Sequence, residues 1–209
     1  MTQYITIEKL EKYLKAMVIL DIIMVAEKDA WLRLISAEKL DGGHGYVIDN
    51  GSGDSLTIYV TSNGAFIKGF DHENECNQFA ADEWDAEFFK HIYGGVPTEF
   101  TNFLDEDAMD NTTFCMWCTG KKDLWRQNEM DGNDGGKEFL LRYICQNAED
   151  WCEWAKYYYE MDINMDIVQK VYDGVQLVEK DVTKLNPDRD ANVALEEINA
   201  FVNDVEERR

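Results

Sequence analysis

The chain has 209 residues, of which 45% are hydrophobic and 12% aromatic, so it can bury a substantial core. It carries 42 acidic side chains against 20 basic ones, which gives a formal net charge of −22 at pH 7. Nucleic acid and anionic lipid are held by clustered Lys and Arg, so this charge argues against both as partners.

The first half of the chain combines a helix with several strands. An apolar stripe that begins after Thr6 repeats at three and four residues and predicts an N-terminal helix; it consists of Ile7, Leu10, Leu14, Met17 and Val18. Four short segments rich in β-branched and aromatic residues then predict strands, at 31–36, 46–49, 56–61 and 65–70. Because the sequences between them, DNGSGD at 49–54 and SNG at 62–64, favour tight turns, we expect an antiparallel meander.

Helical spacing dominates the second half of the chain. It predicts helices within 80–105, where Trp84, Phe88 and Ile92 share a face, and then at 139–144, 151–158, 167–172 and from Asp190 onward. A further strand is expected at 112–118, with Trp125 continuing the sheet. The fold class is therefore α+β: about four to six strands, mainly residues 31–70 and 112–126, packed against an N-terminal helix and a C-terminal set of helices. We expect one compact domain, 1–209.

The compartment is predicted from the N-terminus and the cysteines. The first residues lack the basic start and apolar stretch of a signal peptide, and the longest apolar run, 16–20, ends at Asp21, too short to span a bilayer. Five cysteines, an odd number, favour reduced thiols. A cytoplasmic protein without membrane contact is the expectation.

Half of the net charge lies within residues 71–110, where twelve acids face one base, Lys90. The acids are Asp71, Glu73, Glu75, Asp82, Glu83, Asp85, Glu87, Glu99, Asp105, Glu106, Asp107 and Asp110. Such an asymmetry directs a field toward a basic protein partner. The alternative is that these acids form solvated faces that keep the protein soluble.

The segment GFDHE at 69–73 is a candidate metal site. If it is extended, Asp71 and Glu73 point to one side and His72 to the other. If the chain turns after Phe70, the three side chains converge and, with His44, offer nitrogen and oxygen ligands to a divalent ion. The alternative is a strand end whose polar residues cap backbone groups.

Two other motifs are better explained structurally. Cys115 and Cys118 form a CxxC on a predicted strand, where an odd separation sends the sulfurs to opposite faces. The loop containing Asp131, Asn133 and Asp134 lacks the closing Glu of an EF-hand and is expected to be a turn. No phosphate-binding or dinucleotide motif occurs, so no cofactor is predicted.

The aromatic run at 151–159 divides by helical position. Trp151, Trp154 and Tyr158 share one face and are expected in the core, whereas Tyr157 and Tyr159 are expected at the surface. Exposed Tyr beside acids is typical of protein interfaces. The candidate partner-binding residues are therefore Glu83, Asp85, Glu87, Asp105, Glu106, Asp107, Tyr157 and Tyr159.

Five segments resemble a group of bacterial cytoplasmic proteins of unassigned function. They are NGSGD (50–54), GAFIKGFDHE (64–73), TFCMW (113–117), WAKYYYE (154–160) and LNP (185–187), spread over about two thirds of the chain. The group is similar in character to immunity proteins, which neutralise a toxin by covering its active site. This resemblance implies a whole domain and a protein partner, without a reaction or catalytic residues.

The leading prediction is a non-enzymatic protein-binding domain, with an immunity-like inhibitor of a basic bacterial toxin, or of another basic protein, as its specific form. One alternative is a metal-dependent hydrolase that uses Asp71, His72 and Glu73. Another is a structural subunit that self-associates into a homo-oligomer.

Overall fold

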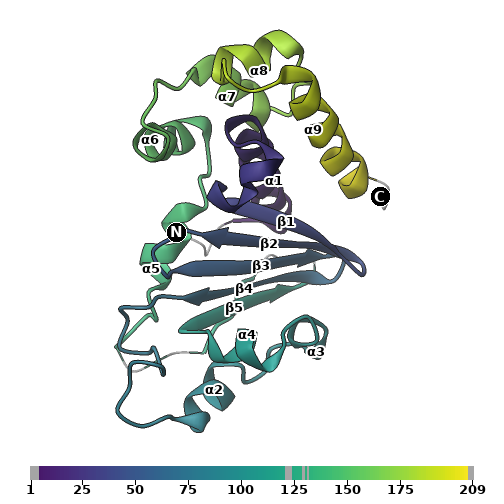
Figure 1. The fold of residues 1–209 in the computed structure, drawn as a ribbon. Coiled ribbons are helices and arrows are strands. Elements are labelled where there is room, and N and C mark those ends of the chain that lie inside the picture. Colours follow the sequence, from purple (N-terminus) through teal and green to yellow (C-terminus); the bar gives the residue numbers. More distant parts are fainter. Residues whose placement is uncertain (1–4, 121–123, 129, 131, 207–209) are drawn as a thin grey trace. The chain divides into compact units, whose positions relative to one another are not determined.

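The computed structural model describes residues 5–120, 124–128, 130 and 132–206. For residues 204–206 it describes the backbone alone. It confirms the α+β class, with helices and a five-stranded antiparallel sheet of strand order β1-β2-β3-β4-β5 (Figure 1). The chain divides into two units, which are described separately. The first unit is residues 1–7 and 40–143, and the second is residues 8–39 and 144–209. A single compact domain stays a prediction.

The first unit contains the predicted meander. Strands β2 (Gly43–Asp49), β3 (Ser55–Thr61), β4 (Gly64–Phe70) and β5 (Phe114–Thr119) pair antiparallel with their neighbours in this order. The turns between the first three strands are the short polar segments that the sequence marked, where Gly51, Gly53 and Gly64 adopt positive φ. Local turn chemistry therefore sets the register of these strands.

One face of this sheet is covered by helices of the same unit. Helices α2 (Ala86–Ile92), α3 (Thr98–Thr101) and α4 (Glu106–Asp110) lie together beside β5 (Figure 1). The hydrophobic core on this face is mainly aromatic and consists of Tyr59, Phe66, Phe100, Cys115 and Trp117. The rings of Phe66 on β4 and Phe100 on α3 stack with centroids 5.8 Å apart. This packing fixes α3 against the sheet.

The chain returns to β5 through an isolated bridge. The amide of Trp117 donates to the carbonyl of Arg126 at 2.9 Å, and the amide of Arg126 donates back at 2.7 Å. The sequence predicted that Trp125 continues the sheet, and the bridge forms at the next residue. Residues 121–123, between β5 and this bridge, lie outside the described residues. The first unit ends with α5 (Lys137–Leu140) and the 3₁₀-helix η3 (Leu141–Tyr143).

A lysine is buried in the first unit. Lys68 on β4 is 4% exposed, and its Nζ donates to the carbonyl of Asn111 at 2.7 Å. Burial lowers the pKa of Lys68 to about 8, so the ammonium form is disfavoured in the folded state. Below pH 8 this lysine therefore destabilises the fold, and the penalty disappears as pH rises toward the ordinary pKa of lysine.

We expect the substitution Lys68→Met to raise the free energy of unfolding by about 1 to 2 kcal/mol at pH 7, because the gain from removing a buried charge exceeds the lost hydrogen bond. Urea denaturation measures this change. The matched control is Lys90→Met on α2, an exposed lysine, for which we expect a change below about 0.5 kcal/mol. A destabilised Lys68→Met protein would contradict the prediction.

The second unit contains α1 (Ile7–Met24, of which residue 7 belongs to the first unit), the 3₁₀-helix η2 (Glu27–Leu32), most of β1 (Ile35–Leu40) and four C-terminal helices. The last four are α6 (Ala148–Tyr158), α7 (Met165–Tyr172), α8 (Glu179–Leu185) and α9 (Ala191–Glu206).

The predicted strand at 31–36 is wrong in its first half, because Trp31 and Leu32 form the end of η2 and Trp31 is 79% exposed. Helix α8 was not predicted.

A carboxylate between two arginines connects α9 to the end of α1 in the second unit. Glu197 accepts from Arg33 at 2.7 Å through one oxygen and from Arg189 at 2.8 Å through the other. The same arginines also donate to carbonyls near the end of α1, Arg33 to Val25 at 2.7 Å and Arg189 to Ile22 at 3.1 Å. Glu197 thereby satisfies two guanidinium groups that are largely removed from water.

An aspartate is completely buried in α1. One carboxylate oxygen of Asp21 accepts from the amide of Ile35 at 2.9 Å, and the other accepts from the hydroxyl of Tyr159 at 3.0 Å. Burial raises the pKa of Asp21 to about 7 despite these hydrogen bonds. The apolar stripe of α1 is therefore interrupted by a polar group that joins it to β1 and to the residue that follows α6.

Candidate functional site

The predicted partner-binding acids of the first unit are all exposed: Glu83, Asp85, Glu87, Asp105, Glu106 and Asp107. Two of them also stabilise helix ends. Asp85 caps α2 by accepting from the amide of Glu87 at 2.9 Å, and Asp105 caps α4 by accepting from the amide of Ala108 at 2.7 Å. The remaining four cap no helix, and three of them, Glu83, Glu106 and Asp107, are available to a partner, whereas Glu87 pairs with Lys90 on the same helix.

Four aromatic side chains form a continuous cluster among these acids. In the exposed aromatic cluster, which we define as Phe79, Trp84, Phe88 and Phe89, the rings of Phe79 and Trp84 meet edge to face at 5.4 Å. Trp84 then stacks on Phe89 at 5.1 Å, and Phe88 contacts Phe89 at 5.3 Å. Phe79 is 58% exposed and Trp84 is 47% exposed. Phe88 and Phe89 are half-buried, so the cluster presents two large aromatic side chains, Phe79 and Trp84, to solvent in an ordered arrangement.

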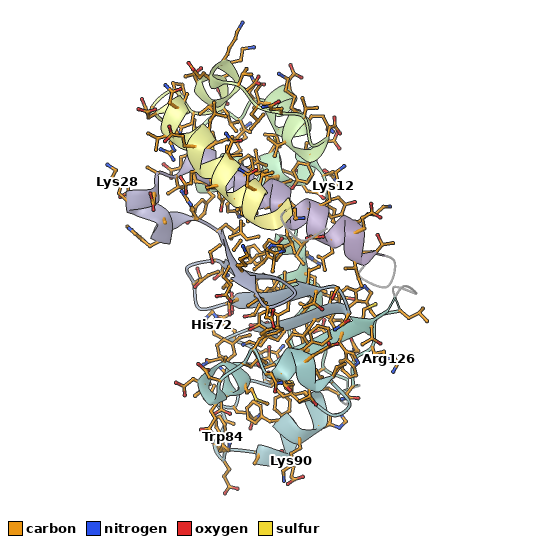
Figure 2. The ribbon with its side chains drawn as sticks, turned by 90° about the vertical axis from the view of Figure 1, so that its right-hand side faces the viewer. Lys12, Lys28, His72, Trp84, Lys90 and Arg126 are labelled. Atoms are coloured by element: carbon orange, nitrogen blue, oxygen red, sulfur yellow. The ribbon has the colours of Figure 1, made fainter. Side chains whose placement is uncertain are left out.

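The loop before α2 explains why Trp84 is exposed. The sequence placed Trp84 on a helix face, but α2 begins at Ala86, and Trp84 precedes it (Figure 2). Asn77 holds the loop by donating to the carbonyl of His72 at 2.7 Å and accepting from the amide of Phe79 at 3.0 Å. Hydrogen bonds within the loop thus fix its conformation. In the sequence, the exposure of Trp84 was indicated only by the alternation of acidic and aromatic residues at 82–89.

The predicted tyrosines behave differently from each other. Tyr157 is 82% exposed, as expected. Tyr159 is only partly exposed, because its hydroxyl binds Asp21 and its ring contacts Trp151 and Trp154, so its assignment to an exposed face is wrong. Tyr158 was expected in the core but is 41% exposed. Its hydroxyl donates to the carbonyl of Leu32. All three belong to the second unit, whereas the predicted acids belong to the first.

The candidate metal site contains a residue that the sequence did not indicate. The chain turns after β4, but the group that forms is Asp54, Asp71 and His72 and contains neither Glu73 nor His44. One ligand atom from each lies within 4.8 Å of the others. Of the other predicted ligands, Glu73 has an exposed side chain whose Oε1 is 3.9 Å from His72 Nε2, and His44 lies on β2 opposite Val60.

Strand pairing brings Asp54 to this position. Ser55 at the start of β3 lies opposite Phe70 at the end of β4, so the residues on either side of this pair, Asp54 and Asp71, are neighbours. Asp54 is 5% exposed, and one of its oxygens lies 2.7 Å from His72 Nδ1. In the sequence, this arrangement follows only from the antiparallel pairing predicted for the two strands, because that pairing places the NGSGD turn beside GFDHE.

Asp54 and His72 change each other's ionisation. Burial opposes the charge on Asp54, but the hydrogen bonds from the ring and amide of His72 and from Asn50 outweigh it and lower the pKa of Asp54. The hydrogen bond to Asp54 raises the pKa of His72. At this site a buried carboxylate therefore orients an imidazole whose other nitrogen faces Glu73.

The remaining sequence motifs have structural roles. Cys115 and Cys118 are both buried, and all five cysteines are free thiols. The thiol of Cys115 donates to the carbonyl of Ile92 at 3.0 Å, and burial raises its pKa to about 12. In the loop before α5, Asp134 accepts from the amides of Gly136 and Glu138, as expected for a turn. Asp131 lies outside the described residues.

The second unit has a groove that sequence reasoning missed. It has a volume of about 640 Å³ and lies between α1, the segment 174–177 and α9. Its apolar walls include Ile19, Leu177 and Phe201, and Lys12 on α1 also lines it (Figure 2). The apolar spacing within each helix was visible in the sequence, but the space between the helices depends on their packing.

Comparison of the chain with protein-family models, curated proteins and solved structures found no match. Among the described residues, every helix falls short of the length and apolar character needed to cross a membrane.

Proposed function

We propose that this protein binds a basic protein partner through the exposed aromatic cluster and the acids interleaved with it. The observation that carries the proposal is the exposure of Phe79 and Trp84 within a segment that also presents Asp82, Glu83 and Glu87 to solvent. Buried aromatic anchors surrounded by polar residues supply most of the binding energy of protein interfaces. The segment 79–89 offers both parts of such an interface.

The chemistry of this surface favours arginine-rich partners. A guanidinium group stacks on the face of Trp or Phe and pairs with a carboxylate at the same time. The cluster belongs to the same short segment as exposed carboxylates, and residues 71–110 contain one Lys or Arg, Lys90, which pairs with Glu87. A basic segment of another protein therefore finds both kinds of contact within one short stretch of chain.

The same charges disfavour self-association through this surface. Two copies of a chain with net charge −22 repel each other, and two copies of residues 79–89 would bring like charges together. An immunity-like inhibitor that covers the active site of a basic toxin is a specific protein of the proposed kind. Nothing in this proposal requires a reaction by the chain itself.

A fluorescein-labelled peptide of alternating Arg and Ala tests the proposal by fluorescence anisotropy. We expect the double substitution Phe79→Ala/Trp84→Ala to weaken binding by at least about tenfold, because it removes the anchors without changing the net charge. Neutralising three acids of the segment, by Asp82→Asn, Glu83→Gln and Glu87→Gln, is expected to weaken binding by a similar factor and to reduce its salt dependence. Asp85 stays unchanged because it caps α2.

The matched control neutralises three exposed acids of the second unit, by Glu153→Gln, Asp162→Asn and Glu179→Gln. It changes the net charge by the same amount, and we expect the affinity for the peptide to stay within about threefold of the original value. Equal losses in both triple variants, or unchanged affinity after the aromatic substitutions, would mean that binding is non-specific charge attraction. Loss of a dimer after Trp84→Ala, seen by sedimentation, would favour the self-associating subunit instead.

A further inference from the structure

We infer that Asp54, Asp71 and His72 form a binding site for one divalent transition-metal ion. The proposal is independent of the protein partner, since it concerns the turn after β4 and needs no second chain. Two carboxylates and one imidazole whose ligand atoms lie within 4.8 Å of one another are a donor set for ions of the Zn²⁺ class. The imidazole distinguishes this group from a cluster of acids alone.

The three ligands are held in place before any ion arrives. Asp54 accepts from the amide of His72 at 3.0 Å and from the side chain of Asn50 at 2.7 Å. The side chain of Asp71 accepts from the amide of Glu73 at 3.1 Å. The amide of Asp71 donates to the hydroxyl of Thr113, the residue before β5, at 3.1 Å. These bonds fix the backbone and the carboxylates, so an ion that binds Oδ1 of Asp54 and Nδ1 of His72 has to replace only the 2.7 Å hydrogen bond between these two atoms.

The backbone around the site is also closely fitted to the ligands. A Cβ atom at Gly136 would lie 2.3 Å from Oδ2 of Asp71, and one at Gly53 would lie 3.3 Å from the ring of His72. Both glycines adopt positive φ, which side chains disfavour. The turn at Gly136 therefore confines Asp71, and the turn at Gly53 lies close to one side of His72, whose side chain stays 42% exposed.

The charge at this site also favours a cation. Among the residues that the structure describes, the ion-pair partners of Asp54 and Asp71 include no Lys or Arg, and His72 is the cationic partner of Asp54. One imidazole cannot neutralise two carboxylates. Because His72 pairs with the almost completely buried Asp54, a divalent ion would supply the positive charge that the partly buried Asp71 lacks.

Titration calorimetry with Zn²⁺ on the full chain tests the site. Cys76 is partly exposed and lies on the same loop, so the substitution Cys76→Ser is made first to remove a competing thiolate ligand. We expect one Zn²⁺ per chain, and we expect both Asp71→Asn and His72→Gln to weaken binding by at least about tenfold. Asp71→Asn keeps an oxygen acceptor for the amide of Glu73, so it tests the site even if His72→Gln fails to fold.

The matched control is Glu73→Gln, which removes a neighbouring carboxylate that lies outside the group. We expect its affinity for Zn²⁺ to stay within about threefold of that of the parent, and Ca²⁺ to bind more weakly than Zn²⁺ because calcium prefers oxygen ligands. The proposal is overturned if the parent binds no Zn²⁺, if Asp71→Asn binds it with undiminished affinity, or if Glu73→Gln loses as much as Asp71→Asn. Tighter binding of Ca²⁺ than of Zn²⁺ would also overturn it.

Discussion

Replacing Glu197 by alanine is expected to lower the free energy of unfolding by about 3 kcal/mol, because two arginines lose their shared carboxylate. Arg189 is the more deeply buried of the two, with 6% of its side chain exposed against 12% for Arg33. Removing one partner of a buried pair leaves a charge that neither water nor a carboxylate compensates. Chemical denaturation of the purified protein measures the loss.

The adjacent residue provides the control for this experiment. Glu196 has the same chemistry, lies on the same helix and is exposed, so Glu196→Ala is expected to change stability by less than about 0.5 kcal/mol. The substitution Glu197→Gln keeps the size of the side chain and removes only its charge, so we expect it to lose most of what Glu197→Ala loses. Equal effects at positions 196 and 197 would show that the two arginines are adequately solvated without the carboxylate.

Asp21 is expected to make stability fall as pH rises from about 4 to about 7. Its folded-state pKa of about 7 lies above the ordinary value of 3.8, so within this window the folded protein holds a proton that the unfolded chain has released. The stabilising contribution is complete below pH 4 and is lost above pH 7. A shift of about three pKa units corresponds to about 4 kcal/mol at most.

The substitution Asp21→Asn removes this titration, keeps an acceptor for the amide of Ile35, and places an amide N–H where the hydroxyl of Tyr159 can accept instead of donate. We therefore expect the stability of Asp21→Asn relative to the original protein to increase by about 2 to 4 kcal/mol between pH 4 and pH 8. Urea denaturation at several pH values measures this difference, in which the titration of other carboxylates cancels. A difference that does not vary with pH would show that Asp21 is charged throughout the range.

Local sequence patterns predicted those elements whose signals lie within a few residues. Strands β2, β3 and β4 follow from β-branched residues bounded by Gly and Asn turns, and these turns fix the antiparallel pairing. Helix α6 follows from its aromatic spacing and from Asn147, which caps the helix by accepting from the amide of Asp150 at 2.8 Å. In each case the stabilising interaction is itself local.

The errors arose where distant parts of the chain decide the structure. Tyr159 turns inward because its hydroxyl reaches Asp21, a residue 138 positions away. Asp54 joins Asp71 and His72 through strand pairing rather than through proximity in sequence. Trp84 was assigned to a helix because its spacing to Phe88 is helical, but the cap at Asp85 starts the helix after it. Periodicity alone cannot report any of these interactions.

The return of the chain at Arg126 affects how this protein behaves at high concentration. The outermost strand of a sheet offers unpaired backbone groups to strands of other molecules, and long uncovered strands of this kind promote aggregation and amyloid. Here the amide and carbonyl of Trp117, in the middle of β5, are already paired with the same chain. An incoming strand at this edge would have to displace that pairing while overcoming electrostatic repulsion, so β5 should resist the edge-to-edge association that a bare strand on a neutral chain would allow.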